Sequence, residues 1–345
     1  MNGGMRADAL LFLAGIASAL AQDAPLNLAL PTNNSALLRG DKAEFYQFVE
    51  RNVHGVISYP WQGGQYGFVR DPVETASGTI FTRFHEGMDI RPLRRDARGE
   101  PLDEVRAIAS GTVVHVNRVA SHSNYGRYVV VEHRWGGCPY YSLYGHLNTI
   151  AVETGQQVKQ GEKLAIMGHT GDGINRERAH VHVELNLMLN DHFEQWHATF
   201  FKNEPNHNGI YNGLNLAGLD LARLFLALRA DSTLTLPAFL AREEVFYKVT
   251  VPNSPNFQLP RRYPWMIGRA PNEKPAAWEV SFTRSGLPLR LAPSSRSVSE
   301  PELSYVQPSP IDYRDLTRGD VAGRGSKARL TESGKAIMRL LTFPD

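Results

Sequence analysis

The sequence predicts a mainly β protein: a twisted antiparallel sheet or open β-barrel-like core, followed by an α+β C-terminal extension. Between residues 56 and 190, short β-branched and aromatic runs are separated by glycine turns at a spacing of roughly ten residues. No helical pattern alternates with these runs, which argues against a parallel sheet of βαβ units. After residue 195 the pattern changes to one apolar, helix-like stretch and a few strand-like runs.

The expected elements follow in chain order. Ser35–Val49 has helical apolar spacing and predicts a short helix. Five runs in the middle of the chain read as strands: Thr112–Val116, Tyr128–Glu132, Tyr140–Leu147, Lys163–Met167 and Val181–Leu187. The last third predicts a helix, two strands, an irregular loop and a helix with Thr331 as its cap, at Leu214–Ala230, Val245–Val251, Trp278–Phe282, Pro293–Asp312 and Thr331–Leu341.

Composition narrows the class of protein. The 345 residues are 42% apolar and 21% charged, which is enough for a core and argues against wholesale disorder. The formal net charge of +2 is nearly neutral, and no concentrated basic stripe indicates nucleic-acid binding. The short Arg-rich run Arg91–Arg98 contains Asp96 and reads as a solvated loop.

The N-terminus predicts export. Arg6 precedes an uncharged apolar run, Ala9–Leu20, and Ala19-Leu20-Ala21 matches a small-x-small cleavage pattern with Gln22 as the mature start. The run is too short to span a bilayer, so we expect a removed signal peptide over residues 1–21, a periplasmic or extracellular location and no stable membrane insertion. A retained anchor and a buried N-terminal helix are the alternatives. Cys138 is the only cysteine, so no intrachain disulfide can form.

Two histidines share one strand near residue 180. In His180-Val181-His182-Val183-Glu184-Leu185, alternation places His180, His182 and Glu184 on one face and the apolar residues on the other. The two imidazoles then lie about 6.5 Å apart along the strand. One could bind a metal while the other reaches a ligand of that metal, but an exposed or structural pair fits this pattern equally well.

A second short motif is His85-Glu86-Gly87-Met88-Asp89. Gly87 allows a tight backbone turn, so the imidazole and the carboxylate can converge on one ion. Nitrogen and oxygen ligands with one position left open are typical of catalytic zinc. A structural zinc site built from thiolates is excluded, because the chain has one cysteine.

The third motif is Tyr144-Gly145-His146-Leu147. Strand alternation places His146 with Tyr144 and Tyr140, away from the apolar face, where a histidine could line a groove. An exposed histidine without a role is the alternative.

Together, these motifs and their spacers resemble the LytM/lysostaphin-type zinc metallopeptidases over about residues 80 to 190. The supporting segments are Ala109–Val114, Tyr125–His133, Thr154–Leu164 and Gly168–Gly171, which look like the family's strands and glycine turns. The resemblance implies that His85, Asp89 and His182 ligate one zinc ion, and that His146 and His180 are the catalytic histidines beside the zinc-bound water.

The resemblance also implies that the substrate is bacterial peptidoglycan. Glu184 then orients a ligand or is a plain polar residue. The segment Arg91–Val105 is longer than a minimal member of the family needs, which predicts an enlarged loop beside the groove. His169 is expected to be non-catalytic and His133 structural. No motif accompanies the remaining histidines considered, His115, His122, His192 and His197.

The expected organisation is a signal peptide (1–21), an N-terminal segment (22–55), a zinc metallopeptidase domain (56–195) and an α+β extension of unknown role (196–345). The expected protein is a secreted, monomeric zinc endopeptidase that cleaves stem peptides or cross-links of peptidoglycan. A non-catalytic regulatory or wall-binding module of the same fold is the alternative. A lipoyl- or biotin-carrier-like barrel would need a modified lysine at a hairpin tip, which the sequence does not offer.

Overall fold

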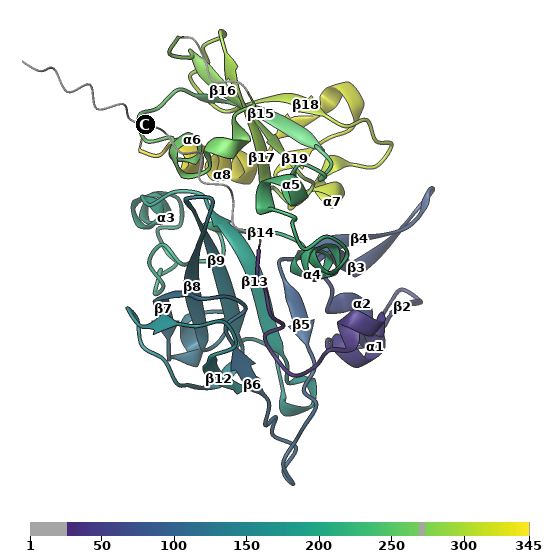
Figure 1. Cartoon of the computed structure of the whole chain (residues 1–345). Helices are drawn as coiled ribbons and strands as arrows, with labels where there is room; N and C mark the ends of the chain where they lie inside the picture. Colours follow the sequence, from purple (N-terminus) through teal and green to yellow (C-terminus); the bar gives the residue numbers. More distant parts are fainter. Residues whose placement is uncertain (1–25, 269–272, 345) are drawn as a thin grey trace, which may run out of the picture.

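The computed structural model describes residues 26–268 and 273–344; the predicted signal peptide lies outside these ranges. The chain forms two stacked parts (Figure 1), a blue-to-teal part that carries the largest sheet and a green-to-yellow part above it. One continuous hydrophobic cluster includes residues of both parts, among them Val183 and Leu185 of the first and Val249 and Phe282 of the second. Within the described ranges, no helix is long and apolar enough to cross a membrane.

The largest sheet has seven strands and is antiparallel throughout, which confirms the mainly β prediction. Its order is β11 (Gln157–Val158), β7 (Gly111–Asn117), β8 (Tyr128–Trp135), β9 (Cys138–Gly145), β13 (Val181–Met188) and β14 (Leu216–Gly218), and β5 (Met88–Ile90) also pairs with β13. Every residue of β13 is buried. The order runs from one edge strand to another, so the sheet stays open, and its last strand comes from beyond residue 195.

Smaller elements surround this sheet. A three-stranded sheet contains β10 (Leu147–Ile150), β12 (Lys163–Met167) and β6 (Glu104–Arg106), and two hairpins contain β1 (Arg51–Val53) with β2 (Val56–Ser58) and β3 (Gly67–Thr75) with β4 (Gly78–His85). The predicted helix Ser35–Val49 is wrong in extent. Gly40, with a left-handed φ of 77°, ends a 3₁₀ turn over Ala36–Arg39, and only Lys42–Phe45 (α1) is α-helical.

The C-terminal part combines a four-stranded antiparallel sheet with short helices. The sheet order is β17 (Pro288–Ser294), β16 (Ala277–Phe282), β15 (Tyr247–Pro252) and β18 (Glu302–Val306), and β19 (Val321–Ala322) pairs with β20 (Arg329–Leu330). The other helices are α2 (Pro60–Gly63), α3 (Phe193–Phe200), α4 (Leu221–Ala230), α5 (Leu236–Leu240), α6 (Leu259–Arg262), α7 (Tyr313–Leu316) and α8 (Glu332–Thr342). Further 3₁₀ turns occupy Ala120–His122, Arg176–Arg178, Pro264–Met266 and Gly325–Lys327.

Two predictions for this part need correction, and three are confirmed: the strands predicted at Val245–Val251 and Trp278–Phe282 are β15 and β16, and the last helix is α8. The loop Pro293–Asp312 contains strand β18, and the helix Leu214–Ala230 begins only at Leu221, because Asp220 caps it by accepting from the N–H of Arg223 at 2.9 Å. The helix predicted after Thr331 is present, and the Thr331 hydroxyl accepts from the N–H of Gly334.

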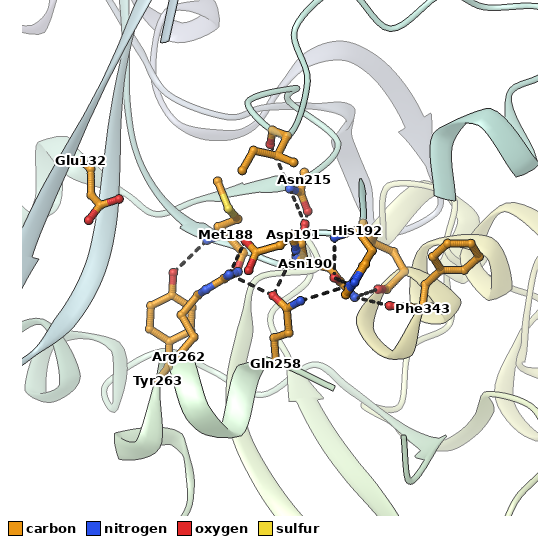
Figure 2. Close-up of polar contacts among 12 residues, drawn as sticks. Glu132, Met188, Asn190, Asp191, His192, Asn215, Gln258, Arg262, Tyr263 and Phe343 are labelled. Atoms are coloured by element: carbon orange, nitrogen blue, oxygen red, sulfur yellow. Dashed lines mark hydrogen bonds and ion pairs between the residues drawn. The ribbon is translucent and has the colours of Figure 1, made fainter. Parts of the chain in front are cut away.

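Buried polar contacts join the two parts where β13 ends (Figure 2). The side-chain amide of Asn190 donates to the carbonyls of Leu340 and Phe343 at 2.7 and 3.0 Å. The N–H of Met188 donates to the Tyr263 hydroxyl at 2.9 Å. Because Asn190 is fully buried, these bonds satisfy polar groups that water cannot reach, and they fix the C-terminal part against the large sheet.

Candidate metal centre

Strand register brings the predicted ligands together. In the pairing of β5 with β13, Asp89 lies directly opposite His182, while Gly145 of β9 lies opposite His182 on the other side. His85 ends β4, and a two-residue connection leads into β5. Gly87 serves this connection by its small size rather than by an unusual backbone conformation. A Cβ there would lie 2.4 Å from the carbonyl oxygen of Val183, so only glycine permits this approach of the connection to β13.

Three ligand atoms converge in the interior of the protein. Asp89 Oδ1 lies 3.1 Å from His85 Nε2 and 2.9 Å from His182 Nδ1, and the two nitrogens are 3.0 Å apart. All three side chains are buried, with at most 4% exposure. A cluster of two imidazole nitrogens and one carboxylate oxygen, all within 4.8 Å of one another, fits the ligand set of a catalytic zinc ion.

Hydrogen bonds on the outer side of the cluster fix which atom of each ligand faces inward. His85 Nδ1 donates to the Gln65 carbonyl at 2.7 Å, which leaves Nε2 as the inward lone pair. His182 Nε2 donates to the Glu184 carboxylate at 2.7 Å, which leaves Nδ1 inward. Asp89 turns its second oxygen outward, where Arg70 Nη2 donates to it at 2.7 Å.

The two predicted catalytic histidines lie beside these ligands. His180 Nε2 is 3.4 Å from Asp89 Oδ1, and its Nδ1 donates to the Arg178 carbonyl at 2.7 Å. His146 Nδ1 donates to the Thr170 carbonyl at 2.8 Å, and the His146 and His180 rings are 4.8 Å apart. In each of these two rings, Nδ1 bonds to a backbone carbonyl, which leaves Nε2 for another partner.

The sequence argument for His146 was wrong about its backbone. Strand β9 ends at Gly145, so His146 is not part of the alternating strand, and it adopts a left-handed φ of 61°. Its neighbour Tyr144 points into the core, where the hydroxyl accepts from the N–H of Ile108 at 2.8 Å. Non-glycine residues in this conformation are uncommon and gather at functional sites. The kink, and not strand alternation, brings His146 to the cluster.

Burial and neighbouring charges shift the pKa values of the ligands. Burial, and then the charge of Arg70, lower the pKa of His85, which keeps its ring neutral. Burial alone would raise the pKa of Asp89, but its interactions with the His85 and His180 rings lower it well below its usual range. Burial also opposes the charged form of His182, yet hydrogen bonds to Asp89 and Glu184 raise its pKa to about 10. A metal ion must therefore displace a proton from His182.

A cleft of about 510 Å³ opens onto the cluster. That volume lies in the range of sites for small ligands and short peptide segments. One wall comes from the C-terminal side of the chain, where Gly213 and Leu214 line the cleft, and Arg318 donates to Glu86, the neighbour of His85, at 2.9 Å. Sequence reasoning missed this wall.

Sequence reasoning also missed Arg70. This residue lies on β3 of a hairpin that the sequence pattern did not predict, and no motif links it to Asp89, 19 residues later. Tyr125 is a further unforeseen neighbour, because its ring packs 5.4 Å from that of His182. Glycine turns flanking the β3–β4 run were the one available signal for the hairpin.

The other histidines have distinct surroundings. His133 is buried under the large sheet, where Nδ1 donates to the Ser110 carbonyl at 2.9 Å and Nε2 lies 2.7 Å from the Ser142 hydroxyl. His169 lies 3.0 Å from the carboxylate of Glu100, which belongs to the segment after Arg91. Three of the remaining histidines contact protein groups away from the metal cluster, namely His115, His192 and His197. His122 lines the cleft and stacks on His207 with ring centroids 4.1 Å apart.

The structure thus combines an open antiparallel sheet with a buried His–Asp–His cluster that lines a cleft and could hold a metal ion. Residues 83–193, the M23 domain, match Peptidase family M23. The predicted relationship to LytM/lysostaphin-type peptidases is thereby confirmed.

Curated relatives are similar over this domain. The lipoprotein NlpD/LppB homolog of Pseudomonas aeruginosa is 35% identical over 116 residues, which cover 32% of this chain and 34% of the relative. An uncharacterized metalloprotease of Haemophilus influenzae is 36% identical over 105 residues, or 30% and 19% of the two chains. Murein hydrolase activator NlpD of Escherichia coli is 33% identical over 81 residues, or 24% and 20%. The matches thus span no more than 34% of the length of these relatives.

Solved structures align over a similar part of the chain. A zinc containing peptidase from Vibrio cholerae aligns at 29% identity with a TM-score of 0.26, covering 35% of this chain and 31% of that one. The catalytic domain of the antimicrobial peptidase lysostaphin from Staphylococcus simulans aligns at 23% identity with a TM-score of 0.25, covering 36% and 82%.

Proposed function

We propose that this protein is a zinc-dependent endopeptidase that hydrolyses peptide bonds in bacterial peptidoglycan. One observation carries the proposal. His85, His182 and His180 each have one ring nitrogen bound to an outer carbonyl or carboxylate and the other within 3.4 Å of Asp89 Oδ1, and the His146 ring lies 4.8 Å from that of His180. A structural site would not need two further histidines oriented in this way beside a complete ligand set.

The residues divide the chemistry between them. His85 Nε2, Asp89 Oδ1 and His182 Nδ1 would hold the ion. A zinc ion in such a set supplies Lewis acidity, which lowers the pKa of water to about 7 and polarises a peptide carbonyl.

The two remaining histidines handle protons. In His180 and His146, Nδ1 is held by a backbone carbonyl, so Nε2 is the atom that can accept a proton and return it to the leaving amine. Burial, and then the charges of His180 and His182, lower the pKa of His146 well below its usual value, so that its ring is neutral at pH 7.

The test is digestion of purified peptidoglycan from several wall types by the zinc-loaded protein, with and without a chelator. Mass spectrometry of the released fragments identifies the bond that is cut. We expect peptide cleavage that the chelator abolishes and added zinc restores. Release of no peptide fragment from any wall type would contradict an endopeptidase.

A second candidate function is that of a non-catalytic regulator. The observation in its favour is that similar proteins, such as the NlpD protein of Escherichia coli, are named murein hydrolase activators. In that case the zinc-loaded protein would release no fragments alone, yet would raise the fragment yield of a separate murein hydrolase. Running both arms of the digestion separates the two functions.

We also infer that the protein is exported and acts outside the cytoplasm. The support is the N-terminal cleavage pattern ending at Ala21 and the lipoprotein names of two relatives. Mass spectrometry of the protein from its native host should give a mature chain beginning at Gln22. A chain that retains Met1 would contradict this export route.

A further inference from the structure

The cleft beside the metal cluster carries an unusual group of arginines. Arg70, Arg51 and Arg178 surround the ring of Phe48, with their guanidinium carbons 3.8, 5.2 and 5.4 Å from its centroid. All four side chains line the cleft. Three positive charges therefore lie around one ring. The repulsion between them costs free energy unless anions are close by.

Two of the three arginines have anionic partners. Arg70 donates to Asp89 at 2.7 Å, and Arg51 donates to Asp71 at 3.2 Å. A metal ion bound to Asp89 would neutralise much of the negative charge of that carboxylate. The positive charge of Arg70 would then be less completely neutralised in the metal-bound protein.

Arg178 differs from the other two. It forms no ion pair with a carboxylate among the residues that the structure describes, although Asp172 also lines the cleft. One Nη1 bond goes to the carbonyl of Gly173, while Nε is buried and has no hydrogen-bond partner. Burial, and then the charge of Arg51, lower the pKa of Arg178. A buried N–H without a hydrogen-bond partner costs free energy, and Arg178 also carries a positive charge without a carboxylate partner among the described residues. Both features favour the binding of an anion.

We propose that Arg178, assisted by Arg51 across the Phe48 ring, binds a carboxylate of the substrate next to the scissile bond, so that the preferred substrates are peptides with a free carboxylate at that position. The planar guanidinium can hold a carboxylate with two parallel hydrogen bonds, as a lysine cannot. Arg178 lies two residues before His180, and its carbonyl accepts from His180 Nδ1. Arg178, His180 and Asp89 line the same cleft, so a carboxylate bound to Arg178 lies in the cleft that holds the reacting groups. Neutral glycine bridges would leave the Arg178 donors unpaired and are disfavoured.

This inference rests on the proposed function only in taking the cleft as the place where substrate binds. The probes are peptides released from peptidoglycan, used with free carboxylates and after conversion of the carboxylates to carboxamides. Calorimetry measures binding, and fragment analysis measures hydrolysis in parallel. We expect the free-carboxylate peptides to bind at least roughly tenfold more tightly to the native protein, the size of one charge-assisted pair.

Variants assign that preference to Arg178. Arg178→Gln should bring the ratio of the two affinities close to one, and Arg178→Lys should restore part of it. Arg134→Gln is the matched control, because Arg134 lies on β8 outside the cleft with a 66% exposed side chain, and its ratio should equal that of the native protein.

The outcomes separate this inference from the proposed function. Preferential binding of free carboxylates without hydrolysis supports the carboxylate site and contradicts the endopeptidase. Equal affinity of the native protein for both peptide forms overturns the carboxylate site, whether or not hydrolysis occurs. A preference that survives in Arg178→Gln also overturns it, and so does the absence of binding to either form.

Discussion

The M23 domain and the C-terminal part contribute to one cleft in different ways. The domain supplies the metal-binding and proton-transfer candidates, and each of these lies in a strand or directly next to one. The C-terminal part supplies walls, through Arg318 and the segment around Leu214, and it buries the edge of the sheet with β14. The chemistry is therefore local in sequence, whereas access to it depends on contacts between distant segments.

The largest expected effect is removal of a ligand from the domain. His182→Ala deletes the nitrogen opposite Asp89 in the sheet register, so the variant should lose stoichiometric zinc, as measured by metal analysis after dialysis. His54→Asn is the matched control, because His54 is exposed in the β1–β2 turn and asparagine tolerates its positive φ. A His182→Ala protein that keeps its full zinc content would show that the ligand assignment is wrong.

The second effect concerns the pH dependence of stability and His133, which is buried on β8 of the large sheet. Burial lowers the pKa of His133 to about 4, against an ordinary value of 6.5. Below pH 6.5 the unfolded chain takes up a proton at this residue, but the folded protein does so only near pH 4, so the free energy of unfolding falls as pH falls across this window. The loss is up to about 3 kcal/mol.

Denaturant titrations between pH 7 and 4 measure this loss. Relative to the native protein, His133→Gln should show a shallower decline in unfolding free energy over that window, even if it is less stable at pH 7. The exposed His54→Asn variant should keep the native slope. Identical slopes in all three proteins would exclude the role given to His133.

The third effect concerns Glu184, the residue that holds the outer nitrogen of the ligand His182. Glu184 is fully buried and accepts from His182 Nε2 at 2.7 Å, so Glu184→Gln removes the charge that orients and polarises this ligand. We expect zinc affinity to fall roughly 10- to 100-fold, as competition with a chelator would measure. Glu177→Gln, an exposed change on the loop before His180, should leave the affinity unchanged. If Glu184→Gln binds zinc with the affinity of the native protein, Glu184 has no role in zinc binding.

The smallest effect belongs to the C-terminal part. The Thr331 hydroxyl caps α8 and also donates to the Gly319 carbonyl at 2.7 Å. Thr331→Ala should lower the free energy of unfolding by about 1 kcal/mol, and Thr331→Ser should recover most of it. Zinc content should not change in either variant. Loss of zinc in Thr331→Ala would mean that zinc binding in the M23 domain depends on the C-terminal part.

The sequence predicts residues that lie in local motifs better than residues that depend on contacts between distant segments. His85, Asp89 and His182 are recognisable because they lie in short motifs whose order and connecting sequence resemble one family of metallopeptidases. Arg70 is not recognisable, since it lies on a hairpin that the sequence pattern did not predict and only the folded structure brings it to Asp89. His146 was found for the wrong reason, because a left-handed residue cannot be distinguished from a strand residue by alternation alone.

The errors in the C-terminal part have a similar cause. Pro288 and Pro293 lie in β17, and proline usually argues against a strand. Because β17 and β18 are the two edges of their sheet, the missing N–H of a proline is tolerated there. Whether a strand becomes an edge is decided by the whole sheet and not by the residues of that strand.

The central claim is that His85, Asp89 and His182 form a zinc site through Nε2, Oδ1 and Nδ1. Anomalous diffraction at the zinc absorption edge from crystals of the zinc-loaded protein tests it directly. We predict one strong peak within bonding distance, about 2.0–2.2 Å, of these three atoms. A peak at other residues, or none at these three atoms in crystals that contain zinc, would contradict the account.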